Sequence, residues 1–162
     1  MSIYISIDPG IKKCGLLLAD MQSRKVIEAG IASLSKFSEF VSLWSEEYQV
    51  IKILIGDGTN CKYVMNLLKR NNLSNLNYVN ERGSTLRARF RYWEIGPPNY
   101  FIRWLPQEIL FPPENLDAIV ALILLEDFLK FTFICQRKLI LKFGSNCKNV
   151  ISSRFKFIIS FN

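Results

Sequence analysis

The sequence predicts an α/β protein with a mixed β-sheet and helices on both faces of the sheet. Three observations predict this class. Residues 2–7 alternate with the period of a strand, and residues 14–20 and 26–31 also read as strands. Residues 36–130 then alternate helical spacing with short β-rich runs, as αβ units do. The chain has 162 residues, 49% of them hydrophobic, which suffices for one domain with a substantial core.

Three strands are predicted at the start of the chain, at residues 2–8, 14–20 and 26–31. The Pro9-Gly10 pair turns the chain after the first strand, and residues 21–25 turn it again. Short turns of this kind join antiparallel neighbours, so these three strands should form a meander.

The remainder of the domain, to residue 131, is predicted to alternate helix and strand in the overall order βββαβαβα. Residues 94–114 contain Pro97-Pro98 and Pro112-Pro113, and they are predicted to form a long ordered loop, which in a compact domain is often functional. The other elements are a helix at 36–48, a strand at 50–55, a helix at 61–71, a central strand at 77–80, a helix at 84–93 capped by Ser84 or Thr85, and a helix at about 115–130.

The net charge of +7 is unevenly distributed. Residues 132–162 hold six Lys or Arg and no acid, which leaves +1 for the rest of the chain. The segment 132–162 is therefore treated as a basic C-terminal extension. Because it lacks a clear helical or strand period, it fits an extra structural element, a nucleic-acid-contacting extension, or a divergent end with little function.

Several chemistries are excluded by composition. The chain has no histidine, which rules out a Ser-His-Asp triad and histidine acid–base catalysis. Its four cysteines lack C-x-x-C spacing, so we expect reduced core thiols and no zinc site. No uncharged stretch reaches about 18 residues, and the chain enters its first strand without a signal peptide. We therefore expect a cytoplasmic protein without a membrane partner.

Asp8 is the first candidate functional residue. It ends the first strand directly before the Pro-Gly turn. A carboxylate in this position is held on the sheet with a hydrophobic layer behind it, which suits a metal ligand or a phosphate-facing group. The alternative is an Asx-turn residue that caps the turn.

Asp117 is the second candidate. With Asn115 as N-cap, it lies in the first turn of the last helix, where the dipole favours a carboxylate by roughly 0.3–1 kcal/mol. It also shares a face with Val120 and Leu124 that should be buried, and a buried charge needs a partner such as a metal ion. The residues of this helix expected to reach solvent are Glu126, Asp127 and Lys130.

Glu81 and Asp57 also follow predicted strands. Open αβ sheets bind ligands at such carboxyl ends. Glu81 could instead form a surface pair with Arg82, and Asp57 could belong to a simple Gly-Asp-Gly turn, which makes it the weaker candidate. Hard cations take oxygen ligands, so Asp8, Glu81 and Asp117 together predict a Mg²⁺ or Mn²⁺ site that needs no histidine.

Arginines gather on the helix that follows Glu81. Arg82, Arg87 and Arg91 are predicted to meet the phosphates of a nucleic-acid partner. The alternative is a solvated helix face.

Four segments resemble the YqgF family, the RuvC-like Holliday junction resolvase relatives of the ribonuclease H-like superfamily. They are Asp8-Pro9-Gly10 with Gly15, Ile55-Gly56-Asp57-Gly58-Thr59, Asn80-Glu81-Arg82-Gly83-Ser84-Thr85, and Asp117 to Leu124. The resemblance covers about residues 1–131. It implies a ribonuclease H-like fold and a metal-dependent nuclease acting on branched DNA or precursor 16S ribosomal RNA. By motif it makes Asp8, Glu81 and Asp117 the catalytic, metal-binding acids.

The chain departs from the pattern of that family at several positions. Asn80 stands where many members have Asp, Gly83 stands where Leu is usual, and residues 94–114 form a longer segment. Junction-cutting relatives often act as dimers, which makes a homodimer an expectation. A non-catalytic nucleic-acid-binding protein on the same fold is the main alternative. A sugar-kinase or actin-like ATPase would need a second domain, for which 162 residues leave no room.

Overall fold

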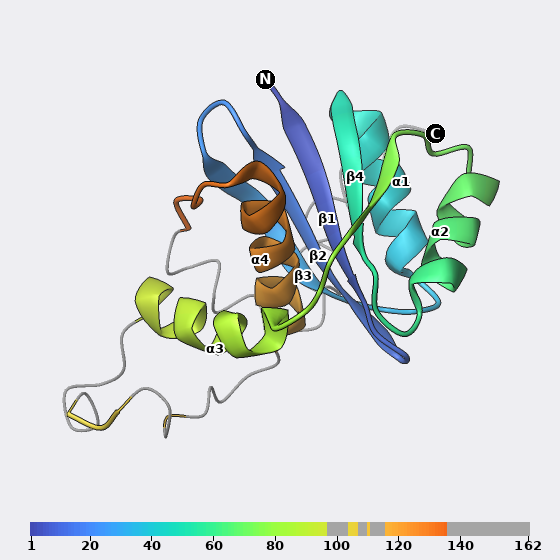
Figure 1. Cartoon of the computed structure of the whole chain (residues 1–162). Helices are drawn as coiled ribbons and strands as arrows, with labels where there is room; N and C mark the ends of the chain where they lie inside the picture. The colour runs from blue at the N-terminus through green and yellow to red at the C-terminus, as the bar shows by residue number, and fades with distance from the viewer. Residues whose placement is uncertain (97–103, 107–109, 111–115, 136–162) are drawn as a thin grey trace, which may run out of the picture.

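The computed structural model describes residues 1–96, 104–106, 110 and 116–135 (Figure 1). The described residues form a five-stranded mixed sheet and four helices, which confirms the predicted α/β class. The elements are β1 (Ile3–Pro9), β2 (Lys13–Asp20), β3 (Lys25–Ser33), α1 (Phe37–Glu47), β4 (Val50–Gly56), α2 (Cys61–Arg70), β5 (Leu76–Val79), α3 (Ser84–Ile95) and α4 (Asp117–Leu129).

The strand order across the sheet is β3-β2-β1-β4-β5. β1, β2 and β3 form the predicted antiparallel meander, while β4 and β5 run parallel to β1. The turn after β2 is closed by the buried Asp20 carboxylate, which accepts hydrogen bonds from the backbone N–H groups of Ser2 (3.0 Å) and Gln22 (3.1 Å). β1 is thus the central strand. The prediction that the strand before Glu81 is central is wrong, because β5 lies at an edge.

Helices cover both faces of the sheet. α1 and α2 pack on the face that carries Ile3, Ile5 and Ile7 of β1. α3 and α4 pack on the opposite face. Because successive strand residues point to opposite faces, Tyr4, Ser6 and Asp8 lie on the α4 side of the sheet. The period-two pattern of β1 therefore places the Asp8 carboxylate under α4.

Helix α4 is buried along almost its whole length, from Ala118 to Glu126. A helix that is apolar on all sides belongs inside a core, and each fully buried Leu or Ile contributes about 1.5–3 kcal/mol. The expectation that Glu126 reaches solvent is wrong: its side chain is 8% exposed. Asp127 is half-buried, and Lys130 is exposed.

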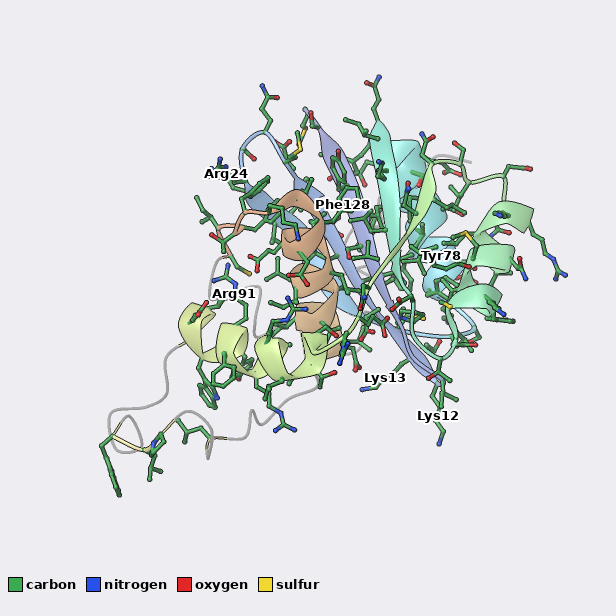
Figure 2. All side chains as sticks on the ribbon, in the orientation of Figure 1. Lys12, Lys13, Arg24, Tyr78, Arg91 and Phe128 are labelled. Carbon is green, nitrogen blue, oxygen red and sulfur yellow. The ribbon has the colours of Figure 1, made fainter. Side chains whose placement is uncertain are left out.

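A buried ion pair compensates the Glu126 charge. One terminal nitrogen of Arg91, which Figure 2 labels on α3, donates to two acceptors. They are Glu126 Oε1 and the Phe133 carbonyl oxygen, each at 2.8 Å. The Phe133 N–H donates to the same Glu126 oxygen at 2.8 Å. This network joins α3, α4 and the segment that follows α4. Beyond Phe133, Ile134 pairs with β3 at Lys25.

The tail and the long loop lie mostly outside the described residues. Of the predicted extension 132–162, residues 136–162 are not described, and within 94–114 only 94–96, 104–106 and 110 are. Cys14, Cys61 and Cys135 are free thiols, and burial raises the pKa of Cys14 to about 12. In the described part of the chain, no helix is long and apolar enough to cross a membrane.

Replacing Arg91 with Met should lower the free energy of unfolding by about 3–5 kcal/mol, because the buried Glu126 carboxylate loses its charged partner. The matched control is Arg70→Met at the exposed end of α2, which should change it by less than about 0.5 kcal/mol. Urea denaturation measures both. Similar losses in the two variants would contradict the structural role of Arg91. Adding Glu126→Leu to Arg91→Met should recover part of the lost stability, because it removes the unpaired buried charge.

Candidate active site

Asp8 lies near the end of the central strand, where β1 is flanked by β2 and β4. Its backbone pairs with Gly15 of β2. Burial, followed by the negative charges of Glu81 and Asp117, raises the pKa of Asp8 from 3.8 to about 7, while the Lys13 charge acts in the opposite direction. The three predicted acids therefore interact electrostatically, although they come from three separate elements.

Asp117 is the first residue of α4 and lies beside Gly15. A Cβ atom built on Gly15 would overlap the Asp117 backbone carbonyl, so the missing side chain of Gly15 allows this close approach. Leu116, not Asn115, precedes the helix as its N-cap, and Asn115 lies outside the described residues. The carboxylate is thus held at the helix N-terminus, next to the strand pair that carries Asp8.

Glu81 follows β5 and folds back over the end of β4. Cβ atoms built on Gly56 or Gly58 would overlap its carboxylate, which shows how closely this side chain lies on the Gly-Asp-Gly segment. Burial raises the pKa of Glu81, the Gly58 backbone N–H lowers it, and the Asp57 charge raises it. Its Oε1 atom is buried and has no hydrogen-bond partner among the described residues.

Asp57 is exposed and has a positioning role. Its Oδ1 atom accepts a hydrogen bond from the Glu81 backbone N–H at 2.9 Å, and its own N–H donates to the Val79 carbonyl oxygen at 2.9 Å. Asp57 thereby fixes the chain that presents Glu81. It also acts on Glu81 through its charge.

Lys13 of β2 is a site residue that the sequence analysis missed. Its ammonium nitrogen is 2.5 Å from Asp117 Oδ2. That oxygen is buried and has no directed hydrogen bond among the described residues, so its contact with Lys13 is an ion pair. The register of β1 and β2 could have indicated it. Gly15 of β2 pairs with Asp8 of β1, and Lys13 lies two residues before Gly15 on the same strand.

The three carboxylates share one charged environment but do not form a compact cage. Among the described residues, no three acidic or cysteine side chains are grouped closely enough to hold a metal ion. The donor chemistry nevertheless suits a hard divalent cation, since all three groups offer carboxylate oxygens and the buried Glu81 Oε1 lacks a partner. Asp8, Asp117 and Glu81 are the residues that would hold such an ion.

The three predicted phosphate-binding arginines have different environments. Arg91 is 15% exposed and held in the ion pair with Glu126, so its guanidinium is engaged within the core. Arg87 forms an ion pair with Asp127. Arg82 is exposed and lines a shallow groove between β5 and the end of α4, together with Tyr78, Val79, Asn80, Arg87, Asp127, Phe128 and Lys130.

The start of α3, next to Glu81, differs from the predicted one. Gly83, with a left-handed φ of 75°, precedes the helix, and no side chain in the described part of the chain caps it. Ser84 is instead a buried first residue of the helix, so the predicted cap is wrong. Glycine is favoured at position 83 because this left-handed backbone conformation strains residues that have a Cβ atom.

The sequence matches no model of a known protein family and no curated protein.

Alanine substitutions at Gly15 and Gly58 should have different costs in stability. Gly15→Ala should cost more than about 3 kcal/mol of stability, because its Cβ meets the backbone of α4, which cannot move alone. Gly58→Ala should cost only about 1 kcal/mol, because the flexible Glu81 carboxylate can swing aside. Urea denaturation measures both costs. Equal losses would contradict the packing described for Gly15.

The raised pKa of Asp8 makes stability depend on pH. The folded state binds the Asp8 proton more tightly than the unfolded state, so stability should fall as the pH rises from about 4 to 7. In chelator, Asp8→Asn should remove this loss and stabilise the protein at pH 8 by about 1–3 kcal/mol relative to wild type. Denaturation at pH 4 and pH 8 tests this, with Glu46→Gln on the exposed end of α1 as control. A pH dependence unchanged in Asp8→Asn would refute it.

Proposed function

We propose that the protein is a metal-dependent endonuclease of the YqgF type, with a ribonuclease H-like fold. The order of elements and the five-stranded mixed sheet with an acid on its central strand are compatible with that fold. The observation that carries the proposal is the electrostatic site around Asp8. Like charges gathered in a partly buried place are costly for folding, and such groups are typical of functional sites.

Asp8, Glu81 and Asp117 would hold Mg²⁺ or Mn²⁺. A bound ion of this kind activates water and stabilises the leaving oxygen when a phosphodiester is hydrolysed. The chain positions these acids on rigid supports: Asp8 on the central strand, Asp117 on α4 against Gly15, and Glu81 through its backbone bond to Asp57. Burial of Asp8 and Glu81 limits the access of bulk water to their carboxylates.

Surface charge supports the substrate class that we propose. Arg82 directly follows Glu81 and lines the groove that reaches Lys130, where a phosphate backbone would find positive charge. We propose structured nucleic acid as substrate, either branched DNA or precursor ribosomal RNA, with the protein acting in the cytoplasm and as a homodimer. A non-catalytic nucleic-acid-binding protein is the second candidate. It is favoured by the Lys13–Asp117 ion pair, which already compensates one acid of the site.

Asp8→Asn should reduce cleavage by at least about a hundredfold, the scale expected for loss of a principal electrostatic group. The assay incubates branched DNA, single-stranded DNA and precursor ribosomal RNA with Mg²⁺, Mn²⁺ or chelator. Glu46→Gln serves as the charge-matched control and should cleave like wild type. Full metal-dependent cleavage by Asp8→Asn would refute the assignment of Asp8. Binding without cleavage by the wild type under every condition would favour the second candidate.

A further inference from the structure

Lys13 occupies a fixed place among the acids of the site. It is the first residue of β2, and the next residue, Cys14, pairs with Pro9 of β1. Gly15, which directly follows Cys14, packs against the N-terminus of α4. The backbone of Lys13 is therefore held by the same strand pair that holds Asp8, at the end of the sheet where Figure 2 shows Lys12 and Lys13.

The Lys13 side chain interacts with two of the three acids. Its ammonium nitrogen is 2.5 Å from Asp117 Oδ2, and its charge lowers the pKa of Asp8. The side chains of Lys13 and Asp117 are 40% and 29% exposed, although the Asp117 Oδ2 atom itself is buried, so the ion pair is partly accessible to solvent from the Lys13 side. A lysine in this setting can leave the pair without unfolding the strand that carries it, because its four-carbon stem is flexible.

We infer that Lys13 is an internal counter-ion that competes with a divalent cation for Asp117 and Asp8, and thereby sets the affinity of this site for metal. This inference rests on the proposed metal-dependent function. An ammonium group and a divalent ion compete for the negative charge of the same carboxylates, and the two positive charges repel each other at close range. Binding of the ion therefore weakens the Lys13–Asp117 contact, and the free energy lost from that contact is subtracted from the free energy of metal binding.

Lys12 provides a matched control within the same hairpin. It carries the same charge, it is the direct neighbour of Lys13, and its side chain is exposed and extends away from the fold (Figure 2). Lys12→Gln and Lys13→Gln change the net charge equally. A difference between them therefore reports the position of the Lys13 ammonium and not the total charge of the protein.

The test is calorimetric titration of Mn²⁺ into the chelator-treated full chain, with wild type, Lys13→Gln, Lys13→Arg and Lys12→Gln. Lys13→Gln should bind Mn²⁺ about two- to fivefold more tightly than wild type, the range expected for loss of a partly exposed ion pair. Lys12→Gln should bind like wild type. Lys13→Arg keeps the positive charge, so its Mn²⁺ affinity should remain close to that of wild type. It shows whether replacing the Lys13 side chain alters Mn²⁺ binding when the charge is kept.

Thermal melting supplies a second readout that does not depend on activity. Without metal, Lys13→Gln should melt at a lower temperature than Lys12→Gln, because Asp117 and Asp8 lose their compensating charge. Saturating Mn²⁺ should then raise its melting temperature by more than it raises that of wild type.

Two results overturn the inference in distinguishable ways. Equal or weaker Mn²⁺ binding by Lys13→Gln would refute competition by Lys13 and leave the metal site in place. Absence of Mn²⁺ binding by all four proteins would refute the inference together with the metal dependence of the proposed function.

Discussion

The close packing of α4 against Gly15 controls the geometry of the whole site. Helix α4 is the most buried helix of the described fold, and its N-terminus can approach β2 only because residue 15 has no side chain. Gly15 also pairs with Asp8. One small residue therefore sets the separation between the acid of the central strand and the acid of the last helix. The hydrophobic free energy of burying α4 holds two like charges near each other that would otherwise separate.

Glycine has the same effect on the other side of the site. Gly56 and Gly58 leave room for the Glu81 carboxylate, and Asp57 between them binds the Glu81 backbone. The Gly-Asp-Gly segment thus contacts and positions the connection between β5 and α3. Close approach of backbones at Gly15 thus places Asp8 and Asp117. Glu81 is placed by its backbone hydrogen bond to Asp57 and by the contact of its carboxylate with Gly56 and Gly58.

The positions of the strands and helices along the chain could be predicted from the sequence better than which of them lie side by side in the fold. Alternation and helical spacing are local properties, so the strands and helices through α3 could be located to within a few residues. The edge position of β5 depends on pairing between distant segments, and nothing within residues 77–80 encodes it. Glu126 illustrates the same limit: helical spacing placed it toward solvent, but α3 and the segment after α4 cover that face. Lys13 was missed because its ion pair joins residues that are 104 positions apart.

Pairing of Ile134 with the start of β3 has a consequence for the edges of the sheet. An edge strand offers unpaired N–H and C=O groups to other chains. At β3 the chain itself uses some of these groups: Ile134 donates to the Arg24 carbonyl oxygen at 2.7 Å, and its own carbonyl accepts from Val26. The opposite edge is β5, which is only four residues long and carries exposed Asn77 and Tyr78. Among the described residues the two edges of the sheet therefore differ: the start of β3 is paired with the chain's own Ile134, and β5 offers only a short edge.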